Sequence, residues 1–237
     1  MTRRRWIADE VSGTRAALVG AHAEHLSRVL RARVGQEFDI TAENEVRRGR
    51  ITTIAPERVE FELGDVIPAP APPQVTLALS IFKFDRMEWA IEKCTELGVA
   101  RIVPVIARRT DAHLATAAGK RVDRWRRIAL QSAEQSRRIS APDVSMPVKL
   151  QDAAAISGSL RILLSETEAE VMMKDVVQSH SGDGVVILAL GPEGGWTDEE
   201  LKLFQNAGWI SASLGNTILR AETAAIAAMA IVQSELS

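Results

Sequence analysis

Cysteine is almost missing from this chain, which contains a single one, Cys94, among its 237 residues. One thiol excludes an intrachain disulfide framework and suits a reducing compartment. The chain also lacks a run of about 20 apolar residues, the length that a membrane span requires. No apolar region follows its basic start, as a signal peptide would need. We therefore expect a cytoplasmic protein with no membrane attachment.

Several motifs of known chemistry are missing as well. Sequences of the GxSxG, HExxH and CxxC types are absent. No glycine-rich segment continues into the Gly-Lys-Ser/Thr of a P-loop, which disfavours a nucleotide hydrolase. The histidines lack metal-ligand spacing with Cys94 or with one another, so we expect no metal site. These histidines are His22, His25, His113 and His180.

The net charge of −2 hides a strong local asymmetry. Residues 101–140 contain ten Arg or Lys and three acids, whereas residues 166–205 contain nine acids and two lysines. A basic segment of this kind is the charge distribution that a phosphate-binding surface needs. The alternative is a solvated helix face with intrahelical ion pairs, which the small number of nearby acids makes less favoured.

A proline-rich segment, GDVIPAPAPPQ at residues 64–74, marks the clearest boundary in the chain. Proline fixes φ and lacks an N–H, so this segment cannot continue a helix or a sheet ladder. We therefore expect a small domain over residues 1–67, a stiff linker over 68–74 and a larger domain over 75–237.

The sequence patterns differ on the two sides of this linker. Before it, alternation and β-branched residues at 37–41, 47–54 and 59–63 predict a mostly antiparallel β domain, with one helix at 21–33. After it, continuous apolar strands alternate with helices, which predicts a parallel sheet covered on both faces. Those strands are expected at 75–82, 101–107, 161–165, 185–190 and 209–214.

The first helix after the linker has clear start and stop signals. Asp85 and Glu88 have the spacing of a capping box, and Gly98 supplies the C-terminal stop. The apolar stripe of this helix is formed by Met87, Ala90, Ile91, Cys94 and Leu97. We interpret Cys94 on that stripe as a core residue and not as a nucleophile.

A glycine-rich turn lies in LALGPEGGWTDEEL, residues 188–201. A buried strand enters it, and a helix follows for which Thr197 is the expected N-cap, with Glu200 returning the capping-box contact. Ligands of open α/β sheets bind beyond the carboxyl ends of the strands, where this loop lies. The loop is either a backbone cradle for a cofactor or a tight turn without a ligand.

A second turn lies in LGNTILRAETAAIAAMAI, residues 214–231, before an Ala-rich helix that suits a packed interior or a subunit interface. Arg220 and Glu222 stand at the entrance of this helix. They are either functional side chains or a local ion pair with a helix-start acid. A further helix is expected over residues 124–138, with arginines near its ends that could contact nucleic-acid phosphates.

These segments resemble a known family. GPEGGWTDEEL and LGNTILRAETAA are similar to the C-terminal signature of the bacterial small-subunit ribosomal RNA uridine-N3 methyltransferases, within the SPOUT superfamily. Residues 83–105 and 124–144 resemble two other blocks of that family, and residues 25–38 resemble its N-terminal segment. The similarity runs in the same order through nearly the whole chain.

The resemblance implies an S-adenosylmethionine-dependent 16S ribosomal RNA (uracil-N3) methyltransferase. Its fold would be α/β, with a SPOUT methyltransferase domain that contains a deep trefoil knot and an N-terminal PUA-like β-barrel that binds RNA. Pattern alone predicts an unknotted doubly wound sheet, because knots are very rare. The resemblance also implies a homodimer that acts on small-subunit ribosomal RNA or on the assembled 30S particle.

By the same resemblance, S-adenosylmethionine would lie in the knot. The residues implied to surround it are Leu164, Ser165, Glu166, Leu190, Gly191, Pro192, Glu193, Gly194, Gly195, Leu214, Gly215, Ile218, Leu219 and Arg220. Arg220 is the candidate that would stabilise the uracil anion, and Glu222 is a weaker candidate for the base. RNA contacts are expected from Arg5, Arg28, Arg31, Arg108, Arg109, Arg137 and Arg138.

Two other functions stay open at this point. One is a SPOUT enzyme that acts on a different RNA position, for example a ribose 2′-hydroxyl. The other is a ribosome-assembly factor that binds RNA without catalysis. The block at residues 83–105 and the PUA-like start favour the uridine-N3 family over the first, and the intact glycine loop favours catalysis over the second.

Overall fold

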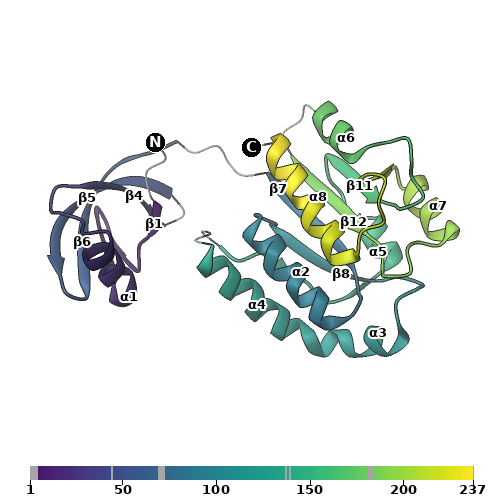
Figure 1. Ribbon diagram of the computed structural model, residues 1–237, viewed down its shortest axis with the longest axis horizontal. Helices are drawn as coiled ribbons and strands as arrows, with labels where there is room; N and C mark the ends of the chain where they lie inside the picture. The colour runs from purple at the N-terminus through teal and green to yellow at the C-terminus, as the bar shows by residue number, and fades with distance from the viewer. Residues whose placement is uncertain are drawn as a thin grey trace. The chain divides into compact units, whose positions relative to one another are not determined.

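The computed structural model describes residues 5–43, 45–68, 73–136, 138, 140–180 and 184–236. The chain divides into two compact units, Met1–Ala71 and Pro72–Ser237. Figure 1 draws both units with their helices and strands labelled.

The N-terminal unit is a curled sheet that forms a half-barrel (Figure 1). In spatial order its strands are β1 (Arg5–Ile7), β4 (Glu37–Ala42), β5 (Glu45–Ala55), β6 (Arg58–Val66), β3 (Arg15–Val19) and β2 (Glu10–Ser12). Only β1 and β4 pair in parallel, and the other neighbours are antiparallel. The predicted antiparallel β domain is confirmed, and the first three strands are additional to those that alternation had indicated.

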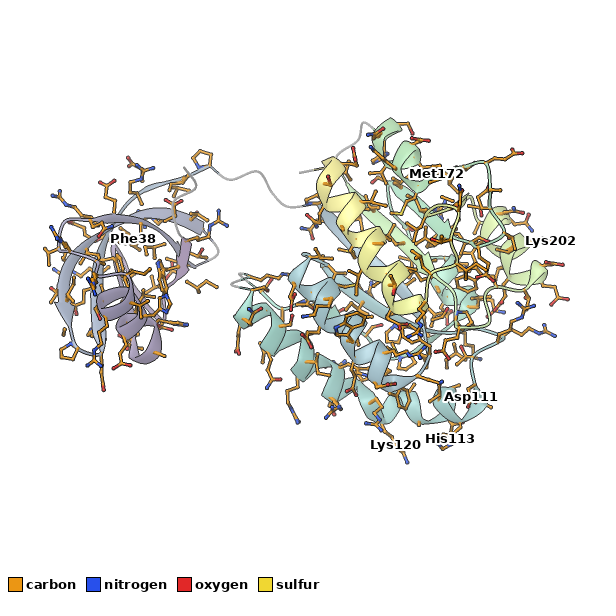
Figure 2. The ribbon with its side chains drawn as sticks, in the orientation of Figure 1. Phe38, Asp111, His113, Lys120, Met172 and Lys202 are labelled. Atoms are coloured by element: carbon orange, nitrogen blue, oxygen red, sulfur yellow. The ribbon has the colours of Figure 1, made fainter. Side chains whose placement is uncertain are left out.

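Alternation along these strands places one face of each in a common core. Phe38 and Ile40 on β4 pack with Phe61 on β6, and Figure 2 shows Phe38 inside the curled sheet. The helix predicted over 21–33 ends at Val29 in the structure. It consists of α1 (Gly20–Glu24) followed by a π-helical turn, η1 (His25–Val29). The wider π turn changes which residues share a face. Val29, at the end of this turn, is 66% exposed, whereas Leu26 is buried.

The C-terminal unit is built on a sheet in which every pair of neighbours is parallel. Its order is β10 (Val148–Lys149), β8 (Arg101–Ile106), β7 (Gln74–Ser80), β12 (Val185–Leu190), β11 (Leu160–Leu164) and β13 (Ile210–Ala212), with β9 (Asp143–Val144) also beside β8. The predicted parallel sheet is confirmed, and its strands fall on the five apolar segments expected from the sequence, with two short additions.

Helices cover both faces of this sheet, as the continuous apolar strands predict. Consecutive residues of β7, such as Leu77 and Ala78, face opposite sides of the sheet and belong to two different core clusters. One cluster lies under α2 (Phe84–Glu96), α4 (Val122–Gln135), α6 (Met173–Ser179) and α8 (Ala221–Leu236), and the other lies under α5 (Leu150–Ala154) and α7 (Asp198–Asn206). A short helix, α3 (Ala112–Ala118), and a 3₁₀ turn, η2 (Gly119–Arg121), precede α4.

The helix α2 confirms its predicted stripe and stop but not its predicted start. Four stripe residues are buried, and Gly98 has a φ of 91° just beyond the C-terminus. The helix begins at Phe84 after Lys83, and no side chain caps it, so the capping box of Asp85 and Glu88 is wrong. The Glu88 carboxylate instead accepts two hydrogen bonds, at 2.7 and 2.8 Å, from Arg124 on α4.

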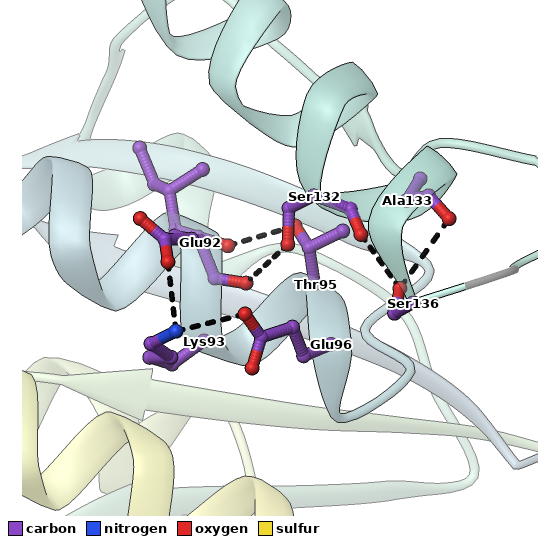
Figure 3. A network of polar contacts seen from close by, with 8 residues as sticks. Glu92, Lys93, Thr95, Glu96, Ser132, Ala133 and Ser136 are labelled. Carbon is purple, nitrogen blue, oxygen red and sulfur yellow. Dashed lines mark hydrogen bonds and ion pairs between the residues drawn. The ribbon is translucent and has the colours of Figure 1, made fainter. Parts of the chain in front are cut away.

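The contact between α2 and α4 contains further polar interactions, which Figure 3 shows from close by. Ser132 Oγ on α4 donates a hydrogen bond of 2.8 Å to the backbone carbonyl of Glu92 on α2. On the outer side of α2, Lys93 Nζ forms ion pairs of 2.7 and 2.8 Å with Glu92 and Glu96. The bonds from Ser132 and Arg124 join α2 to α4, and α2 is the helix that carries Arg86 to the site described below.

Candidate functional site

A cavity of about 670 Å³ lies where the carboxyl ends of β11, β12 and β13 meet. Its walls are the end of β11, the loop after β12 and the loop after β13, which are the three segments that sequence reasoning brings together. All of the cofactor residues predicted from the sequence line it except Gly194. Glu222 does not line the cavity, whereas Arg220 does and is exposed. The sheet therefore gathers segments far apart in the chain into one concave surface.

Several lining residues were missed by sequence reasoning. The additional residues are Arg86, Glu168, Ala169, Trp196, Ala212, Ser213, Asn216, Thr217, Ala221 and Ala224. Most of them adjoin predicted positions in the chain, and their types carry no separate signal. Arg86 is different, because it comes from α2 in a distant part of the sequence. Only the helix that follows β7 brings it to the cavity.

The loop after β12, residues 191–196, turns sharply at its glycines. Gly195 N donates a hydrogen bond of 2.9 Å to Pro192 O, and Gly195 itself has a φ of 67°. A side chain at Gly195 would also overlap the carboxylate of Glu166. Glycine is therefore favoured here by backbone conformation, whereas the overlap would be relieved if the exposed Glu166 side chain moved.

The helix start after this loop confirms a sequence prediction. Thr197 is the N-cap of α7, and Glu200 completes the capping box by accepting from Thr197 N at 2.8 Å. The same carboxylate accepts a hydrogen bond of 2.7 Å from Arg108 N. Because Glu200 is buried, these bonds satisfy a carboxylate that would otherwise lose its hydration uncompensated.

Arg109 reaches the glycine loop from the segment after β8. Its Nη1 donates to Gly194 O at 2.7 Å and to Trp196 O at 3.1 Å. The two carbonyl groups flank Gly195. This arginine, predicted from its charge to contact RNA, is thus engaged with the backbone of the cavity wall.

Arg86 connects the glycine loop with the start of α8. Its Nη1 donates to Glu193 Oε1 at 2.9 Å, and its Nε lies 3.8 Å from Glu222 Oε1. Glu222 is only 3% exposed, and its Oε2 has no hydrogen-bond partner among the described residues. Arg220 forms no ion pair within that part of the chain, so the local Arg220–Glu222 pair considered from the sequence is not present.

The basic segment 101–140 uses many of its arginines internally. Arg101, Arg108 and Arg124 pair with Asp143, Glu199 and Glu88, all of which lie outside the segment. Arg138 donates from Nη1 to Thr95 O at 2.9 Å, and burial lowers the pKa of its guanidinium. Arg137 lies outside the described residues. Counting acids within the segment therefore understated how many of its cations are paired.

Other cations are left facing solvent. Lys120 and Arg127 are exposed and form no ion pair with the described residues, and Figure 2 shows Lys120 pointing away from the body of the unit. In the N-terminal unit, Arg5 and Arg31 are exposed, and Arg28 forms an exposed ion pair of 3.1 Å with Glu24. Lys120, Arg127, Arg31 and Arg28 can therefore meet a polyanion without losing a buried partner.

No group of three or more His, Cys, Asp or Glu residues among those that the structure describes is arranged to hold a metal ion. Within the same residues, no helix has the length and apolar character needed to cross a membrane.

Comparison with known proteins defines the class of this fold and site. Residues 69–233 match the family model described as an RNA methyltransferase domain. The matched range includes every segment that lines the cavity.

The relatives of the chain define the family more narrowly. Ribosomal RNA small subunit methyltransferase E from Synechocystis is 31% identical over 234 residues, which are 96% of this chain and 76% of that protein. The enzyme of the same name from Aquifex aeolicus is 28% identical and is matched over 97% of its length. The chain therefore belongs to the family of ribosomal RNA small subunit methyltransferase E.

Two solved structures resemble both units of the chain. One is ribosomal RNA small subunit methyltransferase E from Neisseria gonorrhoeae bound to S-adenosyl methionine, with 30% identity, a TM-score of 0.67 and coverage of 97% of this chain and 96% of that one. The other is a methyltransferase from Legionella pneumophila in complex with the bound cofactor SAM, with 29% identity, a TM-score of 0.65 and the same coverage.

Proposed function

We propose that this protein transfers a methyl group from S-adenosylmethionine to N3 of a specific uridine in small-subunit (16S) ribosomal RNA. The observation that carries the proposal is the cavity of about 670 Å³ that three parallel strand ends and two glycine-bearing loops form together. Family membership supports ribosomal RNA as the substrate, and the resemblance of GPEGGWTDEEL and LGNTILRAETAA supports uridine N3. The enzyme would act in the cytoplasm as a homodimer.

The residues around the cavity fit S-adenosylmethionine. Small-molecule sites occupy roughly 300–1,000 Å³, and the volume of this cavity lies in that range, while its lining combines apolar residues with polar and charged ones. Leucine side chains offer apolar surface to an adenine ring, and loop backbone groups offer donors and acceptors to its edge. The lining carboxylates of Glu166, Glu168 and Glu193 suit a ligand with a positive sulfonium.

Particular segments would hold the donor. The end of β11 at Leu164–Glu166, the loop 190–195 and the loop 214–220 would surround it, in the part of the chain that would form the knot of a SPOUT domain. When bound, S-adenosylmethionine supplies an electrophilic methyl group. The chain itself must align the nucleophile and exclude water from the cavity.

Arg220 is the proposed group that activates the uracil. Uridine N3 becomes a good nucleophile when its proton leaves, and a cation near the uracil carbonyls stabilises the resulting anion. Arg220 lines the cavity, is exposed and has no ion-pair partner among the described residues, so its charge is available. The uridine must also be unpaired or flipped for N3 to reach the cavity.

Glu222 is the proposed base that accepts the N3 proton, although it does not line the cavity itself. It lies two residues from Arg220, and one of its buried oxygens has no hydrogen-bond partner among the described residues. The Arg86 guanidinium 3.8 Å from its other oxygen would keep the carboxylate in place. Glu222→Gln preserves the shape of the side chain and removes its basicity, so we expect turnover to fall while the fold is retained.

Ribosomal RNA would be held by exposed cations. Arg5, Arg28, Arg31 and Arg108 are exposed members of the predicted set, and the positions of Lys120 and Arg127 suit the same role. Arg137 and Arg138 are also proposed to contact RNA, as their charge suggests. Affinity that depends on phosphate contacts should fall steeply as salt rises.

The test is nucleoside mass spectrometry of small-subunit ribosomal RNA after reaction with the full chain and S-adenosylmethionine. We expect N3-methyluridine with the wild type and a loss of at least about 100-fold with Arg220→Ala, the usual scale for a charge-stabilising group. Methylation at a ribose 2′-hydroxyl would contradict the proposed position. Absence of both methylation and donor binding would point to an assembly factor. Full activity of a folded Arg220→Ala dimer would overturn the role of Arg220.

A further inference from the structure

The glycine loop 191–196 needs an external support to keep its shape. Glycines lose more conformational freedom on ordering than other residues, so a loop rich in them does not hold one conformation by itself. Gly195 has a positive φ, and its only hydrogen bond within the loop joins it to Pro192. Contacts from neighbouring elements must therefore fix the loop before a ligand arrives.

Arg109 supplies such a contact at the point of the turn. A single guanidinium nitrogen, Nη1, bridges the carbonyl oxygens of Gly194 and Trp196, one on each side of Gly195. The stem of Arg109 also lies against Gly194, because a side-chain carbon built there would be 3.3 Å from Arg109 Cδ. Gly194 does not line the cavity, so Arg109 braces the loop from outside the ligand space.

The segment that carries Arg109, residues 107–110 after β8, is itself held by hydrogen bonds. Ala107 and Thr110 exchange two hydrogen bonds of 3.1 Å, Ala107 N to Thr110 Oγ1 and Thr110 N to Ala107 O. Between them, Arg108 N donates to the buried carboxylate of Glu200 at the start of α7. The segment after β8 is thus tied to the helix that follows the glycine loop, which gives Arg109 a fixed origin.

We propose that Arg109 is a positioning residue that holds the loop 191–196 in its donor-binding conformation, and that it is not a phosphate ligand for RNA. The proposal rests on the proposed function, because it takes S-adenosylmethionine as the occupant of the cavity. Hydrogen bonds from a charged donor are stronger than those from a neutral one, and the exposure of Arg109 to water reduces their contribution. We therefore expect roughly tenfold weaker donor binding when the guanidinium is removed.

The neighbouring Arg108 offers a matched control. It carries the same charge, is exposed like Arg109, and its side chain forms only a surface ion pair of 3.2 Å with Glu199. Arg108→Met removes this charge while the backbone N–H that binds Glu200 stays. Arg109→Met removes both hydrogen bonds, and Arg109→Lys keeps the charge but replaces the guanidinium Nη1 that bonds both carbonyls with an ammonium group on a shorter side chain.

Two measurements on the full-length variants decide the question: titration calorimetry with S-adenosylmethionine and the salt dependence of binding to small-subunit ribosomal RNA. We expect Arg109→Met to weaken donor binding about tenfold, Arg109→Lys to weaken it less, and Arg108→Met to leave it unchanged. Only Arg108→Met should reduce the salt slope of RNA binding. Wild-type donor affinity in Arg109→Met, or a salt slope reduced as in Arg108→Met, would overturn the proposal.

Hydrogen exchange in the donor-free protein separates this proposal from the function on which it rests. Amides of residues 193–197 should exchange faster in Arg109→Met than in the wild type, while those of β12 stay protected and show that the variant is folded. If the wild type failed to bind S-adenosylmethionine, the proposed function would be wrong, and faster exchange would still support the brace. Unchanged exchange in these amides would refute it.

Discussion

The indole Nε1 of Trp196 donates a hydrogen bond of 2.9 Å to the backbone carbonyl oxygen of Leu164. Trp196 ends the glycine loop, and Leu164 is the last residue of β11. Both are buried, so the bond is made in a low-dielectric environment where an unpaired carbonyl is costly. The bond therefore sets the distance between two walls of the cavity.

Trp196→Phe should lower both the stability and the donor affinity. The substitution keeps an aromatic ring beside Phe204, whose centroid is 5.2 Å from that of Trp196, but it removes the N–H. We expect the free energy of unfolding to fall by about 1–3 kcal/mol, because the Leu164 carbonyl loses its donor. Urea denaturation measures the first effect, and titration calorimetry with S-adenosylmethionine measures the second.

Trp209→Phe is the matched control for that prediction. Trp209 Nε1 donates to Ala154 O, also at 2.9 Å and also buried, and its ring likewise packs against Phe204, with the centroids 4.9 Å apart. Trp209 does not line the cavity. The Trp209→Phe variant should therefore show a similar fall in the free energy of unfolding and keep the donor affinity of the wild type. An equal loss of donor affinity in both variants would mean that the Trp196–Leu164 bond has no special role in the site.

Gly195→Ala should destabilise the glycine loop. A residue with a side chain pays about 1–2 kcal/mol in the left-handed region that Gly195 occupies at φ 67°. The Glu166 carboxylate, which is exposed, must also move away from the new methyl group. We expect weaker donor binding together with a lower melting temperature in differential scanning calorimetry.

Gly119→Ala is the control that shows whether the losses of stability and donor binding are specific to a glycine in the loop 191–196. Gly119 has helical backbone angles, and a side chain there would make ordinary contact with Met146 at 3.7 Å. Alanine should therefore stabilise the protein by about 0.5–1 kcal/mol without changing donor binding. A Gly195→Ala variant as stable and as active as the wild type would show that the loop tolerates another conformation.

RNA binding should depend more on Lys120 and Arg127, which are exposed and form no ion pair with the described residues, than on Arg124, which is paired with the mostly buried Glu88. Each phosphate contact contributes about 0.7–0.9 to the slope of log affinity against log salt. The double variant Lys120→Gln with Arg127→Gln should flatten this slope by up to about 2. Filter binding at several salt concentrations measures it. Arg124→Gln, which removes a cation already paired with Glu88, should change the slope less, and the reverse order would contradict this assignment.

Cys94 should be unreactive in the folded protein. Burial raises the pKa of its thiol from 9.0 to about 12, so the thiolate is scarce at ordinary pH. Because the folded pKa lies above the unfolded one, the associated stability is complete below pH 9 and is lost as the pH rises toward 12. The slope should approach about 1.4 kcal/mol per pH unit in that window and should be missing in Cys94→Ala. A thiol reagent that modified the native protein rapidly at pH 8 would contradict the burial.

Sequence reasoning succeeded where a pattern depends on near neighbours. The period of apolar residues predicts β4, β5 and the strands of the parallel sheet, and the capping box of Thr197 and Glu200 lies within four residues. It failed for the start of α2, where Glu88 bonds to Arg124 from another helix instead of capping its own. It also missed the π-helical turn at His25–Val29, which exposes Val29.

The sequence by itself determined the glycine turns, the alternation of strands and helices, and the family to which the chain belongs, because these are written in residue type and spacing. Only the tertiary structure decided that Arg86 reaches the cavity and that Arg109 grips a loop 85 residues further along the chain. It also decided that arginines of the basic segment pair with acids outside it. The physical reason is that a charged side chain bonds to whatever the packing of strands and helices brings within about 3 Å, and spacing along the chain does not encode that distance.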